Sequence, residues 1–228
     1  MTLQRPSSRL GRALVSAAAL AAAVAALPTP RATAGCPIPD AAAPALAAVE
    51  PGRRLTFIDA RLTSAEHDAR IWTYGWGIGF AAAGLGSLAA VPFVAPQNRV
   101  DYYTGAVSAG VGVATLIIVP PEVLDAAPAL RAEIARSPPG AAPCALLGAA
   151  EDHLVRVARD EERQGAWYVH LGNVVFNVGV GLFLGLGYHH WAAGAINAGV
   201  GTAVGEALIL TRPTAAIDDL AAYRAGRF

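Results

Sequence analysis

The sequence predicts an all-α, polytopic membrane protein with four transmembrane helices, arranged as two tandem parallel helical hairpins that are each preceded by an amphipathic helix. Of its 228 residues, 54% are hydrophobic and only 15% are charged, whereas a soluble domain carries about 25% charged residues. Four apolar stretches are each 18–25 residues long, enough for a helix to cross the ~30 Å hydrocarbon core of a bilayer. The second half of the chain also repeats the first.

The repeat is visible in two blocks. Residues 61–86 match residues 156–181 at six of 26 positions, and residues 105–114 match residues 194–203 at seven of ten. The identities of the longer block are Arg61/Arg156, Glu66/Glu161, Trp72/Trp167, Gly77/Gly172, Gly84/Gly179 and Gly86/Gly181. Glycine matches are common in such a composition, but the Trp pair and the shared Arg–Glu spacing are not. The pattern predicts an internal duplication, and convergent glycine patterning is the alternative.

The amino terminus, residues 1–34, has the features of a signal peptide. Three arginines precede an apolar run of fifteen residues, Ala13–Leu27, and small residues at 32–34 provide a cleavage site. Fifteen residues are too few to span a bilayer, which favours a cleaved signal over a stable span. A lipoprotein signal is the alternative because Cys36 follows small residues, although Thr33 stands where such signals usually carry Leu.

Repeat 1 covers residues 35–119. Apolar residues at helical spacing predict an amphipathic helix over residues 53–70, which leads directly into the uncharged stretch 71–95. Aromatic residues open that stretch, as is typical of a membrane interface. A short polar connection and a second apolar stretch, residues 102–119, complete the first hairpin.

The remainder of the chain divides into three parts. Residues 120–143 are expected to form a Pro-rich linker, because six prolines lie within the segment. Repeat 2, residues 144–211, again consists of an amphipathic helix and two transmembrane helices, joined by a tight turn at His189 and His190. Residues 212–228 are expected to form a short polar tail.

The topology predicts a disulfide. The linker does not cross the membrane, so both hairpins enter from the same side, as parallel repeats about an axis along the membrane normal. With a cleaved signal, the long segments are periplasmic in a bacterial-type inner (cytoplasmic) membrane. Cys36 and Cys144 then lie on the same oxidising side and are expected to pair.

The arginine distribution favours the opposite orientation. Twelve arginines lie in the segments expected outside, and only Arg99 lies in the inner turns. Positive charge normally favours the cytoplasmic side. The signal peptide takes precedence here because the first apolar segment usually decides orientation.

Polar residues distinguish the second hairpin from the first. The candidates inside its apolar stretches are Asn173, Asn177, Asn197 and Glu206. The aligned positions of the first hairpin hold Ile78, Ala82, Ser108 and Ile117. Two interpretations are open for the asparagines, namely helix–helix hydrogen bonding and a polar seam that contacts a solute or an ion. Glu206 either handles a proton or cation, since an ionisable residue inside a span is a functional candidate, or reaches to the interface.

Glycines recur at four-residue steps along the apolar stretches, and small residues on one face let helix backbones approach closely. The candidates for helix packing are Gly77, Gly84, Gly86, Gly112, Gly181, Gly185, Gly201 and Gly205. His189, His190 and Asp101 near the turns suggest a metal site as an alternative to ordinary interfacial residues. His170 lies at the opposite end of its span and cannot join them.

The most favoured function is that of a non-enzymatic structural or interaction protein packed through glycine faces. No phosphate loop, nucleophile elbow or metalloprotease helix is present in the sequence. We therefore expect no cofactor and no metal, and we expect the lipid bilayer and a second copy or another membrane protein as partners. The 17 basic and 17 acidic residues balance, which argues against nucleic acid. The alternative is a small channel or transporter lined by the polar residues of the second hairpin.

Overall fold

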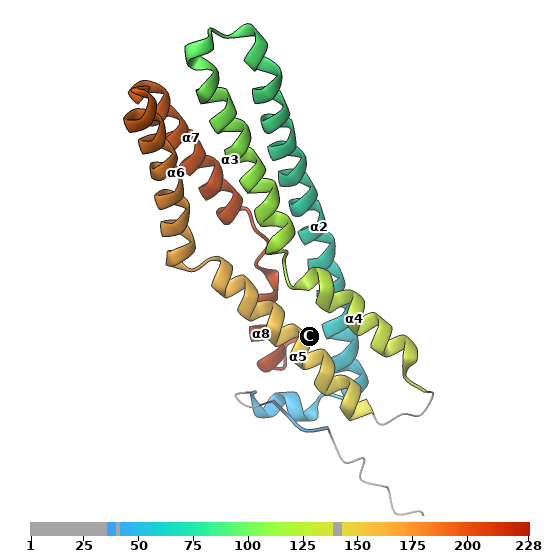
Figure 1. The fold of residues 1–228 in the computed structure, drawn as a ribbon. Coiled ribbons are helices and arrows are strands. Elements are labelled where there is room, and N and C mark those ends of the chain that lie inside the picture. Colours follow the sequence, from blue (N-terminus) through green and yellow to red (C-terminus); the bar gives the residue numbers. More distant parts are fainter. Residues whose placement is uncertain (1–35, 40–41, 139–142) are drawn as a thin grey trace, which may run out of the picture. The chain divides into compact units, whose positions relative to one another are not determined.

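The computed structural model describes residues 36–39, 42–138 and 143–228 (Figure 1). The predicted signal peptide lies outside this range. Helices account for 85% of the described residues and no strand occurs among them, which confirms the all-α class. Four helices are long and apolar enough to cross a membrane, as the apolar stretches predict.

The first two of these helices are α2 (Pro51–Ala90) and α3 (Arg99–Ile118). The carboxylate of Glu50 caps α2 by accepting hydrogen bonds from the first backbone amides of the helix, at 3.0 Å each. The predicted amphipathic and apolar segments form one continuous helix of 40 residues. Two short 3-10 helices, η2 (Val91–Phe93) and η3 (Pro96–Asn98), turn the chain into α3, which packs antiparallel against the second half of α2.

The second half of the chain follows a similar order with one difference. Helix α5 (Pro143–Gln164) ends before α6 (Trp167–Tyr188), so the membrane-spanning part begins as a separate helix. The chain then turns into α7 (Trp191–Leu210), which packs along α6. His189 forms the turn in the left-handed region at φ 60°, and the amide of His190 bonds back to the carbonyl of Leu184 at 3.0 Å.

The structure differs from the expectation for residues 120–143 and 212–228. The expected Pro-rich linker contains α4 (Val123–Arg136), and the expected polar tail contains α8 (Ala215–Arg224). Pro128 lies inside α4 and removes one helical hydrogen bond. The helix continues past it because its apolar side is buried against α2 and α5. Tertiary packing thus outweighs the local effect of proline.

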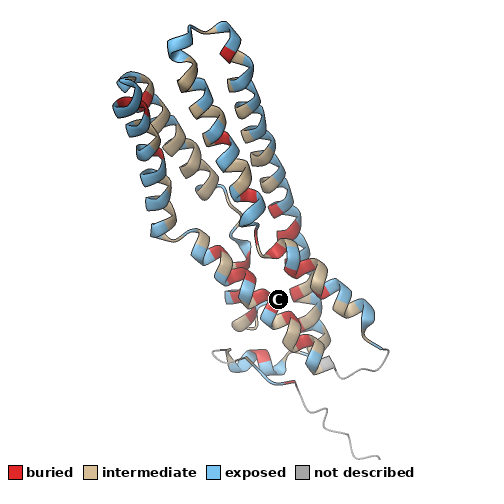
Figure 2. Cartoon of the chain, in the orientation of Figure 1, coloured by how far each residue is buried: buried red, intermediate tan, exposed pale blue. Residues whose placement is uncertain are grey.

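These two helices complete a bundle outside the apolar stretches. Helix α5 packs against the first half of α2, and helices α4 and α8 each pack against both of them. Figure 2 shows the buried residues concentrated in this bundle, whereas the spanning helices are largely exposed. The largest fully buried apolar side chains of the bundle core are Leu46, Ile58, Leu62, Leu130, Leu147, Leu154, Val157 and Tyr223. The apolar faces of α2 and α5 are therefore covered by protein, while the spanning helices expose theirs.

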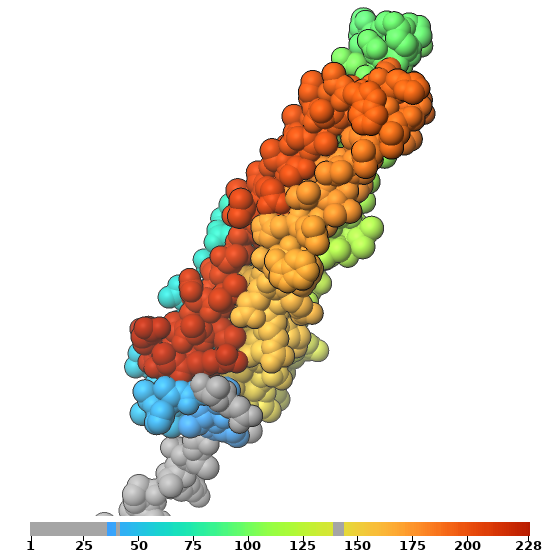
Figure 3. Space-filling view, turned by 90° about the vertical axis from the view of Figure 1, so that its left-hand side faces the viewer, coloured from blue at the N-terminus to red at the C-terminus, as the bar shows by residue number. Residues whose placement is uncertain are grey.

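The segment before α2 is fastened to the bundle at two points. The amide of Ala43, just before η1 (Pro44–Ala48), donates to the carbonyl of Arg224 at 2.8 Å, and Figure 3 shows this segment against α8. A disulfide joins Cys36 to Cys144 at the start of α5, which confirms the predicted pairing. Both ends of the described chain thus meet in the bundle.

Candidate functional site

The polar residues of α6 lie against glycines of α7. A Cβ placed on Gly205 would overlap the amide of Asn173, and a Cβ placed on Gly201 would overlap that of Asn177. Only glycine leaves room for an asparagine side chain at these two positions. The four-residue spacing seen in the sequence therefore places the amides of one helix on the bare backbone of the other.

The two asparagines form a chain of hydrogen bonds along this interface. Asn177 Nδ2 donates to the carbonyl and to Oδ1 of Asn173, at 2.9 and 2.8 Å. Asn173 Nδ2 donates to the carbonyl of Thr202 at 3.0 Å and to Glu206 Oε1 at 2.9 Å. Both hydrogens of each amide nitrogen are thus used within α6 and α7.

Glu206 is paired rather than isolated. Its Oε2 lies 2.6 Å from His170 Nδ1, and its other oxygen accepts from Asn173. Sequence reasoning missed this pair, although a signal was present. In an antiparallel hairpin with its turn at residues 189–190, counting outward brings Glu206 level with Asn173, and His170 lies about one helical turn further along the same face of α6.

Asn197 takes a different position from the other candidates. Its Nδ2 donates to the carbonyl of Ala193 in its own helix at 2.9 Å, and the side chain lines a cavity of about 530 Å³ between the two hairpins. The wall includes residues of α2, α3, α6 and α7. Its polar members are Ser87, Ser108, Thr115, Asn173, Asn177 and Asn197. Glu206 is not among the lining residues, so the structure does not bring all four candidates to one surface.

Most of the candidate glycines lie where helices meet. Gly84 lies against Ala109, and a Cβ on Gly112 would come within 2.8 Å of the ring of Phe80. The other contacts are Gly77 with Leu116, Gly181 with Gly194, Gly185 with Trp191, and the two Asn–Gly pairs. Gly86 differs from the expectation, because a Cβ there would meet no atom within 4 Å. It lies off the side of α2 that meets α3.

Polar contacts join the two hairpins at both ends of the cavity. Near the bundle, the indole nitrogens of Trp72 and Trp76 donate to Thr211 Oγ1 at 3.3 and 3.0 Å. At the turns, His190 Nδ1 lies 2.8 Å from Asp101 Oδ1. Of the residues considered as a metal site, His190 and Asp101 thus contact each other across the two helix pairs, whereas His189 forms the turn. No cluster of three or more metal-ligating side chains occurs among the residues that the structure describes.

Glu66 and Glu161, which are aligned in the predicted repeat, each bind another part of the bundle. Glu66 accepts from Arg131 of α4 at 2.7 Å and from Arg70 at 2.6 Å. The hydrogen bond from Arg131 is the main reason that the pKa of Glu66 is lowered. Glu161 is equally buried but has no such cation bound to it. It accepts the backbone amide of Ile217, in the first turn of α8, at 3.2 Å.

Burial dominates the ionisation of Glu161. Removal from water raises the pKa of its carboxyl group to about 7, against the opposing effect of hydrogen bonds from the amides of Ile217 and Ala216. Arg212 lies nearby but binds Asp160, at 3.1 Å. The bundle therefore contains a carboxyl group that titrates near neutral pH.

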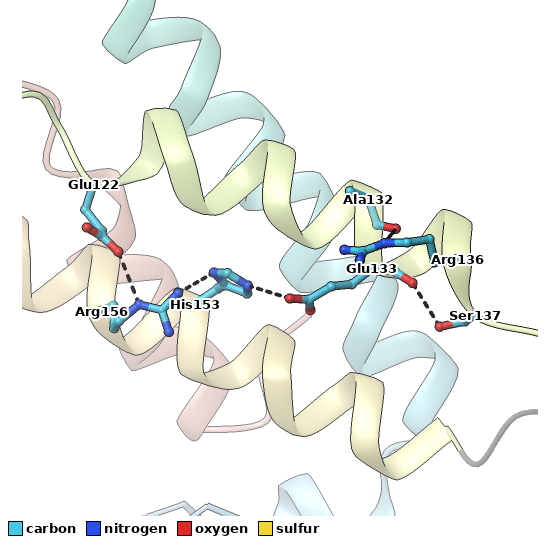
Figure 4. A network of polar contacts seen from close by, with 7 residues as sticks. All are labelled: Glu122, Ala132, Glu133, Arg136, Ser137, His153 and Arg156. Atoms are coloured by element: carbon cyan, nitrogen blue, oxygen red, sulfur yellow. Dashed lines mark hydrogen bonds and ion pairs between the residues drawn. The ribbon is translucent and has the colours of Figure 1, made fainter.

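A third group of polar residues joins α4 to α5 (Figure 4). Arg156 Nε donates to Glu122 at 3.1 Å, and its Nη2 lies 2.7 Å from His153 Nδ1. His153 Nε2 lies 3.5 Å from Glu133. Because arginine only donates, Nδ1 of His153 is the acceptor and Nε2 carries the hydrogen in the neutral ring. The network fixes the tautomer of a histidine that is almost fully buried.

The most deeply buried charge lies at the other end of the bundle. Arg54 is 1% exposed and binds Glu151 of α5, the hydroxyl of Tyr223 and the carbonyl of Pro37. Tyr223 in turn donates to Glu151. Sequence reasoning singled out none of these residues, because no local pattern connects positions so far apart in the chain. Their satisfied hydrogen bonds indicate a structural role.

Comparison with known proteins provides no assignment. No family model matches the chain, and neither a curated protein nor a solved structure matches it.

Proposed function

We propose that this chain is a non-enzymatic integral membrane protein with a structural or interaction role. The observation that carries the proposal is the hydrogen bonding within the second hairpin. Asn173, Asn177, Glu206 and His170 bind one another and the backbone of α7, which supports helix packing rather than a solute path. Most of the candidate glycines likewise meet another helix of this chain, so a second copy or another membrane protein would contact the exposed outer faces.

We further propose that the four spanning helices form two tandem parallel hairpins that arose by duplication. Two equivalent contact pairs support this. Glu66 and Glu161 each bind the helix that follows their own hairpin, α4 and α8 respectively. Arg61 and Arg156 each bind the corresponding helix of the other half, through Asp219 and Glu122. The repeating unit is then one helix longer than the sequence alignment indicates.

The matched glycines support the duplication hypothesis less than the contacts in the bundle do. Gly84 packs against α3, whereas its counterpart Gly179 meets no atom of another helix. Gly86 is open, whereas its counterpart Gly181 lies against Gly194. On the duplication hypothesis, the bundle contacts were kept and the hairpins were repacked.

We propose a bacterial-type inner membrane location with the bundle on the periplasmic side. The disulfide supports this orientation, because such bonds persist in oxidising compartments and the bundle contains both cysteines. The proposed membrane location is tested by fractionation. The protein should remain in the membrane pellet after carbonate washing, and recovery in the aqueous fraction without detergent would overturn it. Orientation is tested with a membrane-impermeant protease, which should cleave the bundle from the periplasmic side only.

A small channel or transporter is the second candidate. The cavity between the hairpins and the position of Asn197 on its wall favour it. Reconstituted protein should then conduct ions or a small solute, and Asn197→Leu or Glu206→Gln should abolish the flux. A structural protein shows no flux, and in it Gly201→Leu disrupts the hairpin because the side chain cannot coexist with Asn177.

A further inference from the structure

The cavity between the hairpins has the dimensions of a small-molecule site. Its volume of about 530 Å³ lies within the ~300–1,000 Å³ typical of ligand pockets. All four spanning helices contribute to its wall, and no lining residue is charged. A molecule that occupies this cavity is therefore uncharged and mostly apolar.

Four polar atoms on the wall have no hydrogen-bond partner among the described residues, Ser87 Oγ and Asn177 Oδ1 included, and two of the four lie on α3 and α7 at aligned positions of the sequence. Asn197 uses its Nδ2 to bond within α7, but among the described residues its Oδ1 and the hydroxyl of Ser108 accept and donate no hydrogen bond. Water satisfies such groups at a protein surface, whereas in the hydrocarbon of a bilayer an unpaired polar group is costly. These two groups point to a ligand that carries its own hydrogen-bonding group.

The depth of these groups places them inside the hydrocarbon. Ser108 and Asn197 lie nine and six residues from the turn-side ends of α3 and α7, or about 14 and 9 Å along the helix axes. They also occupy aligned positions of the blocks 105–114 and 194–203. On the duplication hypothesis they occupy equivalent places on the cavity wall.

We propose that the cavity binds a neutral lipid that carries a free hydroxyl group, with the hydroxyl between Ser108 and Asn197 and the apolar chain along α3 and α7. A hydroxyl group can donate to Asn197 Oδ1 and accept from Ser108, whereas an ester carbonyl can only accept. A phosphate-bearing headgroup is excluded from the cavity because no cationic side chain lines it. The inference rests on the proposed membrane location.

The test is photoaffinity labelling in phosphatidylcholine nanodiscs with a diazirine-bearing long-chain alcohol. Cross-links should map to the cavity wall, on residues 105–115 and 196–209. Oleyl alcohol should compete about tenfold better than methyl oleate, which offers a carbonyl in place of the hydroxyl. Dioleoylglycerol is a second competitor, and it distinguishes a two-chain source of the hydroxyl from a single-chain one.

Two matched variants test the site. Val200→Trp fills the cavity and should abolish specific labelling, whereas Val175→Trp places the same side chain on an exposed face of α6 outside the cavity and should not. Asn197→Leu, which preserves volume, should remove the preference for the alcohol over the ester. A purely structural asparagine would leave that preference unchanged.

The outcomes separate this inference from the membrane location. Labelling spread evenly over the outer faces, or unaffected by Val200→Trp in protein that keeps its wild-type melting temperature, overturns lipid binding alone. A preference for the alcohol that survives Asn197→Leu also overturns it. Failure of the chain to enter nanodiscs contradicts the membrane location.

Discussion

Glu161 should make the stability of the bundle fall as pH rises through neutrality. Burial raises the pKa of this carboxyl group to about 7, so its protonated form is favoured in the folded protein. The perturbation that tests this is Glu161→Gln. Glutamine keeps an oxygen that can accept the amide of Ile217 at the start of α8, but it cannot ionise.

The sign and size of the effect follow from linkage. In the unfolded chain the carboxyl group of Glu161 releases its proton near its ordinary pKa of 4.5. In the folded chain the same group keeps its proton up to about pH 7. The contribution of Glu161 is therefore fully present below pH 4.5 and is lost as pH rises through about 7. Between about pH 5 and about pH 8, wild type should lose about 2–3 kcal/mol relative to Glu161→Gln.

The assay is urea unfolding of the oxidised protein in detergent, followed by far-ultraviolet circular dichroism across this pH range. Glu66→Gln is the matched control, because Glu66 is the aligned residue of repeat 1. Arg131 lowers the pKa of Glu66, so the contribution of Glu66 is present above its unfolded pKa and is lost only as pH falls further. The difference between wild type and Glu66→Gln should thus stay constant over the range in which Glu161 titrates.

A parallel pH dependence of wild type and Glu161→Gln would refute the reasoning. It would mean that Glu161 is ionised in the folded protein at pH 5, and therefore that water or Arg212 compensates the burial. The difference in the free energy of unfolding between the two proteins isolates Glu161, because all other titrating groups are common to both.

Three further changes have expected outcomes. Cys144→Ser opens a loop with a sequence separation of 108 residues and should lower the free energy of unfolding by up to about 4 kcal/mol, measured against wild type under oxidising conditions. Gly205→Ala should lower the free energy of unfolding by about 1–3 kcal/mol, followed by thermal unfolding, because the added methyl group overlaps the amide of Asn173. The control is Gly172→Ala, whose methyl group meets open space and should leave the stability unchanged or slightly raised. Arg54→Met should destabilise the bundle by about 3 kcal/mol in urea titrations because it leaves Glu151 unpaired, and a neutral result would show that the ion pair contributes nothing net.

The four spanning helices could be predicted because lipid imposes a simple requirement. A helix that crosses a bilayer must be long and apolar along its whole length, and that property is visible in any window of the sequence. The pairing of Cys36 with Cys144 could also be predicted, because the sequence contains two cysteines, which have only each other as intramolecular partners.

Helices α4 and α8 could not be predicted in the same way. The prolines around α4 argue against helix locally, and α8 has only ten residues. Both are stabilised by apolar residues whose burial depends on α2 and α5, as with Leu130 of α4 and Tyr223 of α8. Short helices of this kind gain their stability from tertiary packing, which a single sequence does not display.

The sequence predicted which residue types form the candidate site, but not which of these residues contact one another. The spacing of Asn173 and Asn177 placed them on one face of α6, and the glycines of α7 had the same spacing. The pairing of Glu206 with His170 depends on the register of the hairpin, which the length of the turn at residues 189–190 sets. That Asn173, Asn177 and Asn197 all line one cavity depends on where α2 and α3 lie.

The two helix pairs differ in how they pack. The first hairpin packs through apolar contacts, such as that of Phe80 on Gly112, whereas the second packs through asparagine amides on glycine. An amide interface needs every polar atom paired, so it tolerates few changes. Sequence divergence that alters binding is then easiest on the faces of α3 and α7 that line the cavity. There the aligned positions already hold different residues, Ser108 and Asn197.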